Sequence, residues 1–320
     1  MGGFACSSWY FMRFTSPHYD QGPFAPGKMR YWMPVDLYVG GAEHAVLHLL
    51  YARFWTKVLA DAGIVPFREP FTKLLNQGLL LGQDGFRMSK SRGNVITPDH
   101  VVAEHGADAL RVYELFMAPF DQDVSWNTDG INGASRFLNR IWQLIGAAYF
   151  ENKSAVETDP DLLRVLHKTV RRVSERNEGL RFNTMISTLM EYTNILLDRY
   201  QAGTWRTATY HQALETLLVL LAPVTPHIAE ELWQLTGHEI SVHLQPWPYW
   251  DEELARDEFA QIAVQVNGNL RTTIELPVDA SQAEAEQLAW EKSKVRQYLD
   301  AKSVARVFYV PGRILNFVVD

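Results

Sequence analysis

The sequence feature that most constrains the fold is the stretch YVGGAEH at residues 38–44. A short apolar run ends in two glycines and enters a helical pattern that we expect to run from about Ala42 to Ala62 and to stop at Gly63. Glycines at the C-terminal end of a strand let a nucleotide approach the backbone closely. With other strand-like runs, such as Gly78 to Leu81, alternating with helices over residues 1–130, this predicts an α/β layer.

A second distinctive stretch, GQDGFRMSKSRGN at residues 82–94, combines glycines, serines and three cationic side chains. Backbone N–H groups, hydroxyls and the Lys90 ammonium can converge on a polyphosphate there. A mobile lysine suits a reaction in which charge builds up on transferring phosphate oxygens. The alternative is an exposed basic turn that binds nothing.

His44 and His48 lie one predicted helical turn apart, so we expect them to share a face. That spacing also occurs in zinc sites, but the sequence nearby offers neither an HExxH acid nor a third ligand, and the single cysteine forms no CxxC pair. We therefore predict substrate contact and no zinc in this chain. Glu43 is suited to accept hydrogen bonds from ribose hydroxyls.

Composition limits the class of protein. The chain has 320 residues, 47% of them hydrophobic, which suits two or three globular domains. One cysteine excludes a disulfide framework, and the longest aliphatic run, near Leu217 to Ala222, is too short to span a bilayer. These features predict a cytoplasmic protein with no membrane partner. The net charge of −7 does not exclude a local basic face.

Long amphipathic helices are predicted between about Ile131 and Leu235, which indicates a helical bundle. Within it, cationic residues recur at steps of three and four at Arg164, Lys168, Arg171, Arg172 and Arg176. This stripe is either a solvated helix face or a contact with a phosphate backbone. His227 follows Thr225-Pro226 and is expected to be a structural residue at a helix start.

The C-terminal segment has the pattern of a small ββαββ domain. Alternating residues flank Asn267-Gly268, which predicts a β-hairpin, and Ser281 with Glu284 forms a capping box that opens a helix ending near Leu299. Two strand-like runs flank Pro311-Gly312. A second group of cationic residues comprises Lys292, Lys294, Arg296, Lys302, Arg306 and Arg313.

Several motifs together resemble one family. RMSKS followed by RGN, with YVGGAEHAVLHLLYARF, resembles the KMSKS loop and the second half of the catalytic domain of class I aminoacyl-tRNA synthetases, most closely the bacterial-type leucyl-tRNA synthetases. The likeness extends through SSWYF, HGADALRVYELFMAP, LAPVTPHIAEELW and VPGRILNFVV. Glu43-His44 stands where isoleucyl and valyl relatives are expected to carry Asp-Gln, which favours the leucine type.

The resemblance implies activation of leucine by ATP to leucyl-adenylate, with Mg²⁺ on the phosphates, and transfer of leucine to tRNA(Leu). It implies that Lys90 stabilises the pyrophosphate leaving group, with Arg87 in place of the family's first loop lysine. The implied adenylate and ATP contacts are Gly40, Gly41, Glu43, His48, Met88, Ser89 and Ser91. The implied leucine pocket is Phe4, Ser7, Tyr10 and His44. Without the resemblance, Phe4 and Tyr10 would be ordinary core aromatics.

The resemblance also divides the chain. It implies a second half of a Rossmann-like catalytic domain at 1–98 with the loop at 86–94, a stem-contact connector at 99–130, an anticodon-binding-like bundle at 131–255 and a tRNA-binding C-terminal domain at 259–320. The tRNA contacts it suggests are Arg164, Lys168, Arg171, Arg172, Lys292, Arg296 and Arg306.

Some family parts have no match in this sequence, namely the HIGH motif, the first half of the nucleotide fold and the editing domain. We therefore expect the chain alone to make leucyl-adenylate poorly, because positioning two substrates supplies much of the rate. A separate N-terminal synthetase subunit is one expected partner; alternatively Met1 is an internal methionine of a longer chain. Two other functions stay open, a non-catalytic tRNA-binding module and an isoleucyl- or valyl-type synthetase.

Overall fold

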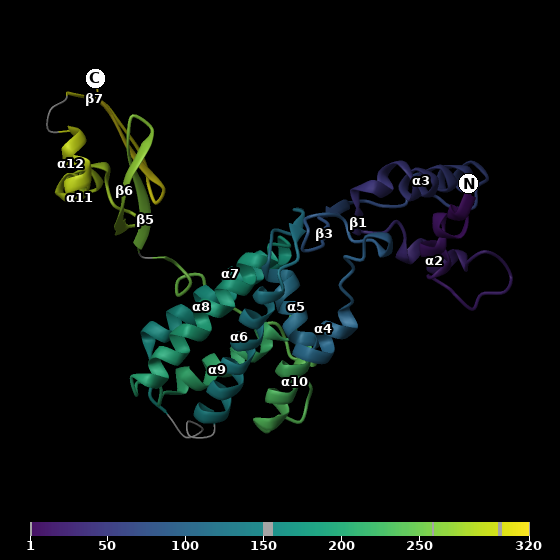
Figure 1. Ribbon diagram of the computed structural model, residues 1–320, viewed down its shortest axis with the longest axis horizontal. Coiled ribbons are helices and arrows are strands. Elements are labelled where there is room, and N and C mark those ends of the chain that lie inside the picture. Colours follow the sequence, from purple (N-terminus) through teal and green to yellow (C-terminus); the bar gives the residue numbers. More distant parts are fainter. Residues whose placement is uncertain (1, 150–155, 258, 300–302, 320) are drawn as a thin grey trace. The chain divides into compact units, whose positions relative to one another are not determined.

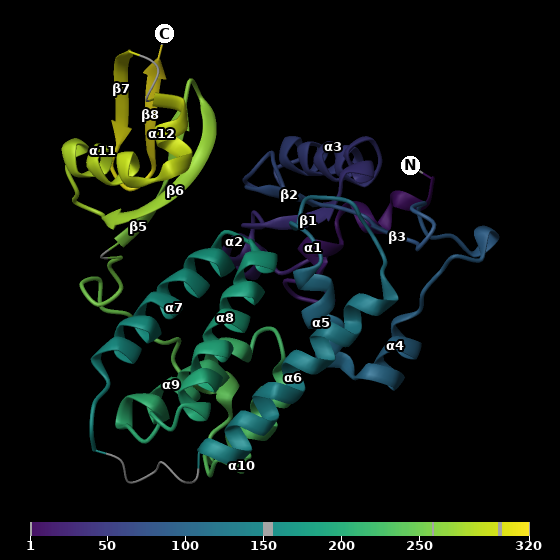
Figure 2. The same cartoon turned by 60° about the vertical axis from the view of Figure 1, so that its left-hand side comes forward.

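The computed structural model describes residues 2–149, 156–257, 259–299 and 303–319, drawn in two views in Figures 1 and 2. The chain forms two compact units. Unit 1 comprises Met1–Ala155 and Arg172–Trp247, and unit 2 comprises Val156–Arg171 and Pro248–Asp320. The division falls inside the helix α7 (Pro160–Glu178).

Unit 1 begins with helical turns packed around a small apolar core. These elements are η1 (Gly2–Phe4), η2 (Cys6–Ser8), α1 (Tyr10–Arg13) and α2 (Pro26–Trp32). Met12, Met29 and Ala52 in this core are almost completely buried. Ala52 belongs to α3 (His48–Asp61), so the core ties the first turns to that helix.

Two parallel strands form the predicted α/β layer. β1 (Tyr38–Gly41) pairs with β2 (Leu74–Gln77), with Tyr38 opposite Leu74 and Gly41 opposite Gln77. Parallel neighbours need a long crossover, and α3 lies in that crossover. The Gly40-Gly41 pair therefore stands at the C-terminal end of a parallel strand, as the sequence predicts.

The helix predicted from Ala42 is wrong at its start. Ala42–Val46 form a 3₁₀ turn (η3), Leu47 has φ −114° and ψ −105°, and the α-helix begins at His48. Because three residues complete a 3₁₀ turn and Leu47 then breaks the path, His44 and His48 are not one α-helical turn apart. The strand predicted at Gly78 to Leu81 is shorter than expected, because β3 covers only Leu80–Leu81. The sequence analysis did not predict β2.

The loop stretch 82–94 connects β3 to two short helices. β3 pairs in parallel with β4 (Val124–Ser125), and the loop contains one 3₁₀ turn, η4 (Lys90–Arg92). α4 (Pro98–His105) begins with proline at its first position, and Gly106, at φ +86°, separates it from α5 (Ala107–Phe116). Thr97 is the residue before α4, and its side chain makes no capping hydrogen bond.

The predicted amphipathic helices are present and their apolar stripes are buried. They are α6 (Thr128–Ala148), α8 (Phe182–Gln201), α9 (Ala208–Leu221) and α10 (Pro226–Leu235). Ile141, Leu189 and Leu217 each have no exposed surface. Among the residues that the structure describes, no helix is long and apolar enough to cross a bilayer.

Unit 2 contains a four-stranded sheet in the order β6-β5-β8-β7, visible in Figure 2. Its strands are β5 (Phe259–Val266), β6 (Asn269–Pro277), β7 (Val304–Val310) and β8 (Ile314–Val319). The predicted hairpin turn is confirmed, because Asn267 and Gly268 have φ values of 50° and 77° between antiparallel β5 and β6.

The single helix expected in this domain is instead two. Ser281 and Glu284 form the predicted capping box, but α11 (Gln282–Glu291) ends at Lys292, whose ψ of 119° is extended. α12 (Ser293–Leu299) then begins a new helix. Ala285 and Ala289 of α11 and Val295 and Leu299 of α12 are buried against the same apolar core of the sheet.

Candidate active site

A cavity of about 260 Å³ lies at the end of β1. Its wall includes the backbone of Gly40 and Gly41, and His44, His48 and Gln77 also line it. Four of the residues predicted to bind adenylate or leucine therefore meet at one cavity. Because the strand end offers no side chain at positions 40 and 41, a ligand can approach its backbone.

Gly41 leaves room for the side chain of Glu43. A Cβ added at Gly41 would lie 2.7 Å from Cδ of Glu43, closer than a carbon atom normally approaches. The glycine therefore lets the carboxylate of Glu43 fold back over the strand end. Glu43 is partly exposed there and remains accessible to a ligand.

The loop at 82–94 is held in shape by Asn94. Its amide donates to Oδ1 of Asp84 at 3.1 Å, and its carbonyl oxygen accepts from the backbone N–H of Ser89 at 2.9 Å. The hydrogen bond from Asn94 is the main reason that the pKa of Asp84 lies below its usual value. Gly85 and Gly93 have φ values of +75° and +69°, which favour glycine.

One ion pair joins the loop to the strand end. The Arg87 guanidinium donates from Nη2 to Oε1 of Glu43 at 3.2 Å. The other cations behave differently, because Arg92 lies over the ring of Phe86 at 4.7 Å, whereas Lys90 is exposed and makes no ion pair within the described part of the chain. The Oγ atoms of Ser89 and Ser91 lie 3.2 Å apart. The structure thus brings Arg87 to Glu43 and leaves Lys90 open to solvent.

Tyr38 is a site residue that the sequence analysis missed. Its hydroxyl lies 2.9 Å from Oη of Tyr10 and 2.6 Å from Nε2 of His48, and its ring stacks on Phe71 at 3.9 Å. A separation of 2.6 Å is short for an N–H donor and suits a hydroxyl donor, so Tyr38 donates to His48. The sequence signal that could have identified Tyr38 is its position at the start of the strand that ends in Gly40-Gly41.

Burial shifts the pKa values of Tyr38 and His48 in opposite directions. Desolvation raises the pKa of Tyr38, with the hydrogen bond to Tyr10 acting in the same direction. Desolvation also lowers the pKa of His48, and the nearby His44 lowers it further. His48 is thus a neutral acceptor for Tyr38 at pH 7, and its Nδ1 is buried without a partner among the described residues.

The other predicted leucine-pocket residues lie beside this network. The Phe4 ring stacks on Tyr51 with centroids 5.5 Å apart, and Oγ of Ser7 donates to the Phe4 carbonyl at 3.1 Å. Neither is a wall of the 260 Å³ cavity. The hydroxyl of Tyr10 contacts that of Tyr38, which lines the cavity. The assignment of Phe4 and Ser7 to a leucine pocket stays a prediction.

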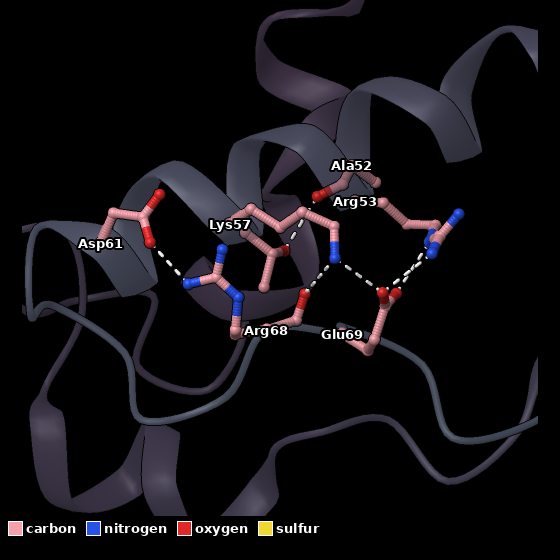
Figure 3. Close-up of polar contacts among 7 residues, drawn as sticks. Ala52, Arg53, Lys57, Asp61, Arg68 and Glu69 are labelled. Carbon is pink, nitrogen blue, oxygen red and sulfur yellow. Dashed lines mark hydrogen bonds and ion pairs between the residues drawn. The ribbon is translucent and has the colours of Figure 1, made fainter.

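An ion-pair network fixes α3 against the chain that leads to β2, as Figure 3 shows. Glu69 accepts from Nε of Arg53 at 2.7 Å, from Nη2 of the same residue at 2.8 Å and from Nζ of Lys57 at 2.7 Å. These contacts, led by Arg53, hold the pKa of Glu69 at about 2. A second pair joins Arg68 to Asp61.

Two residues of the cationic stripe on α7, Lys168 and Arg171, form ion pairs within unit 2. Nζ of Lys168 lies 3.2 Å from Asp257, and the Arg171 guanidinium lies 3.9 Å from the same carboxylate and 3.8 Å from Glu252. Lys168 and Arg171 are only 25% and 22% exposed. The sequence suggested a solvated helix face or a contact with a phosphate backbone. Lys168 and Arg171 instead bind the acidic segment 251–257.

The basic residues of the C-terminal domain are more open. The Arg306 guanidinium lies 4.4 Å from the ring centroid of Phe308, and both side chains are exposed on β7. Nε of Arg296 donates to the carbonyl of Trp290 at 3.3 Å. Arg306 thus differs from Arg171, whose charge is already paired.

Two family models match the chain. The model "tRNA synthetases class I (I, L, M and V)" matches residues 4–127, and "Anticodon-binding domain of tRNA ligase" matches residues 159–287. The "Leucine--tRNA ligase" of Dehalococcoides mccartyi strain 195 is 50% identical over all of this chain, and that of Chlorobaculum tepidum is 48% identical. Along its whole length, the chain is similar to these leucine–tRNA ligases. It spans 39% of the length of these curated relatives.

Solved structures agree with this similarity. LeuRS of Agrobacterium radiobacter K84, in a ternary complex with tRNA and LeuAMS, matches 99% of this chain and 41% of that chain, with a TM-score of 0.80 and 36% identity. Methionyl-tRNA synthetase of Mycobacterium tuberculosis matches 66% of this chain and 46% of that chain with a TM-score of 0.53 at 21% identity, which indicates a shared fold alone. These comparisons give the chain the class I synthetase fold with an anticodon-binding domain.

Proposed function

We propose that this chain supplies the loop-bearing part of a leucine–tRNA ligase, which uses ATP to activate leucine and transfers it to tRNA(Leu). The observation that carries the proposal is the approach of Arg87 to Glu43 at 3.2 Å, beside the cavity at Gly40 and Gly41. A loop that binds phosphates and a carboxylate that binds the ribose would act on one nucleotide, and the contact between Arg87 and Glu43 supports this pairing. We also infer a cytoplasmic location, because a chain with one cysteine has no disulfide framework.

Each residue has a chemical task in this proposal. Glu43 accepts hydrogen bonds from the ribose, and the backbone at Gly40 and Gly41 lies against the nucleotide. Lys90, which is exposed and unpaired in the described chain, balances the charge that grows on the leaving pyrophosphate. Arg87 gives a planar guanidinium where a lysine is expected, and it can bind two phosphate oxygens at once.

Mg²⁺ would be held by the ATP phosphates in this proposal, and would supply positive charge there. Among the residues that the structure describes, no three His, Cys, Asp or Glu side chains form a group able to hold a metal. The metal would therefore depend on the nucleotide for its ligands. The absence of zinc stays a prediction.

The rest of the enzyme is expected to cover an apolar face of α3. Leu50, Phe54 and Val58 follow one another at steps of four, and each is at least 40% exposed. The adjoining β1-β2 sheet has only two strands within the described residues. We propose that further strands and helices of the synthetase, on the same polypeptide or on a separate subunit, pack here.

A second candidate, a tRNA-binding module without catalysis, would use the domains at 131–255 and 259–320. Among the residues considered for tRNA binding, exposed Arg306 beside Phe308 suits it best, because an aromatic ring and a guanidinium can bind a base and a phosphate. This role is compatible with the first, since a leucine–tRNA ligase must also bind tRNA.

Amino-acid-dependent ATP–pyrophosphate exchange tests the proposal. The chain would be assayed alone and after mixing with a polypeptide that carries the HIGH motif of the same enzyme. We expect leucine-dependent exchange only in the mixture, with a decrease of about 100-fold in Lys90→Ala. Lys28→Ala removes an exposed lysine outside the site and is the matched control.

Each other outcome has a definite meaning. Exchange by the isolated chain at the rate of an intact synthetase would contradict the need for a partner. Dependence on isoleucine or valine would replace leucine as the substrate. Absence of exchange in the mixture, together with tRNA binding, would support the non-catalytic module.

A further inference from the structure

A groove of about 760 Å³ lies in unit 1 between α4, α5, α6 and α10. It shares no lining residue with the cavity at the end of β1. Leu138 and Ala109 form a buried apolar floor. Its size exceeds that of one side chain and suits a peptide of a few residues.

The lining of the groove carries three carboxylates, from Glu104, Asp108 and Glu231. Those of Glu104 on α4 and Glu231 on α10 are exposed. Among the described residues that line the groove, none is lysine or arginine. A phosphate-bearing partner would therefore meet negative charge without a cation to balance it.

His227 is held in place by the carboxylate of Asp108. Its Nδ1 lies 2.8 Å from Oδ1 of Asp108, whose carboxylate is buried and also accepts from the backbone N–H of Ile228 at 2.7 Å. A carboxylate only accepts, so Nδ1 of His227 donates to Asp108. The imidazole is 74% exposed at the edge of the groove.

Trp142 supplies a flat apolar surface. It projects from α6, lines the groove and is 42% exposed, which is unusual for so large an aromatic side chain in a helical bundle. An indole face attracts a cation and stacks on a planar group. Asn139, one turn earlier on the same helix, places an amide beside it.

We propose that this groove binds an arginine-bearing segment of a partner protein. A guanidinium has five N–H donors and no acceptor, which complements the carboxylates of Glu104 and Glu231. It is also planar and stacks on an aromatic face, whereas a lysine ammonium does not. The groove volume of about 760 Å³ favours a peptide segment over a free guanidinium compound, and the carboxylates in its lining favour a basic protein over RNA.

NMR titration of the ¹⁵N-labelled chain with acetyl-Gly-Arg-Gly-amide tests this inference. The indole signal of Trp142, assigned with Trp142→Phe, should move in a saturable way. Replacing arginine by citrulline, which keeps the shape and loses the charge, should weaken binding by about tenfold, because charge-assisted hydrogen bonds are lost. A lysine peptide should bind more weakly than the arginine peptide.

Glu231→Gln should weaken binding of the arginine peptide by about threefold, as expected for one exposed carboxylate. Glu239→Gln, an exposed glutamate outside the groove, is the matched control and should change nothing. Equal thermal unfolding of both variants would exclude a folding defect. The readout involves no aminoacylation, so it is independent of the proposed catalytic function.

Three results would overturn the inference. Citrulline and arginine peptides could bind equally, or Glu231→Gln could bind the arginine peptide as tightly as the parent chain. Alternatively, an unmodified tRNA transcript could move the Trp142 signal while the arginine peptide does not, which would assign the groove to RNA.

Discussion

The guanidinium of Arg87 lies 3.2 Å from the carboxylate of Glu43, and this contact joins two sequence segments that lie on opposite sides of α3 and β2 in the chain. Arg87 is 68% exposed and Glu43 is 35% exposed. An exposed ion pair contributes about 0–1 kcal/mol, so a nucleotide can readily replace it. Both side chains are therefore accessible to solvent while they are paired.

Removing the charge of Glu43 is expected to release the loop. In Glu43→Gln, trypsin should cleave after Arg87, Lys90 or Arg92 about two- to fivefold faster, which corresponds to loss of one exposed ion pair. The measurement is limited proteolysis followed by mass spectrometry, without any ligand. Arg87→Lys should preserve part of the protection. Equal cleavage of Glu43→Gln and the parent chain would show that the pair does not restrain the loop.

Tyr38→Phe should destabilise unit 1 by about 1–2 kcal/mol, because it leaves Nε2 of buried His48 and the hydroxyl of Tyr10 without their shared partner. Urea unfolding followed by circular dichroism measures this free energy. Tyr31→Phe is the matched control, since Tyr31 is 79% exposed and should tolerate the change. An unchanged unfolding midpoint in Tyr38→Phe would contradict the role of the hydroxyl network.

The ionisation of His48 should depend on its neighbour. Its pKa is lowered by burial and then by His44, so the neutral ring stabilises the fold above the unfolded value of 6.5, and this stabilisation is lost as the pH falls below it. In His44→Gln the pKa of His48 should rise. NMR titration of the imidazole C–H signals reports both values. A pKa that stays the same in His44→Gln would exclude the charge effect.

The network at Glu69 should respond to acid in a defined range. Its pKa of about 2 lies below the unfolded value of 4.5, so its contribution is present above pH 4.5 and is lost as the pH falls toward 2. The difference in Tm between the parent chain and Glu69→Gln should therefore shrink over that range. A double-mutant cycle with Arg53→Gln, at pH 7, should give a coupling of at most about 1 kcal/mol. A coupling of zero would show that the contact between Arg53 and Glu69 contributes no stability.

Arg306 and Arg171 should behave differently toward tRNA. Arg306→Ala should reduce tRNA affinity and lower the slope of log affinity against log salt by about one, as for a lost phosphate contact. Arg171→Ala should mainly lower the unfolding temperature, because its partners Glu252 and Asp257 lose their cation. Filter binding over a salt series, together with thermal unfolding, distinguishes the two. The opposite pattern would mean that the stripe on α7 binds tRNA.

The sequence alone determined the features that depend on local chemistry. Gly40-Gly41 after an apolar run predicted the strand end, Asn267-Gly268 predicted the hairpin, and Ser281 with Glu284 predicted the helix start. Each of these depends on the φ angle or the hydrogen bonds of a few adjacent residues. The resemblance to leucyl-tRNA synthetases likewise depends on short motifs of contiguous residues, and the relatives at about 50% identity confirm it.

Only the tertiary structure decided which distant groups meet. Tyr38 is a site residue because folding brings Tyr10 and His48 to its hydroxyl. Lys168 and Arg171 are paired with an acidic segment that lies about 80 residues later in the chain. Periodicity also could not show the break at Leu47, since an apolar pattern does not distinguish a 3₁₀ turn from an α-helix. Charge pairing and donor direction act through space, so they are fixed only when the chain is folded.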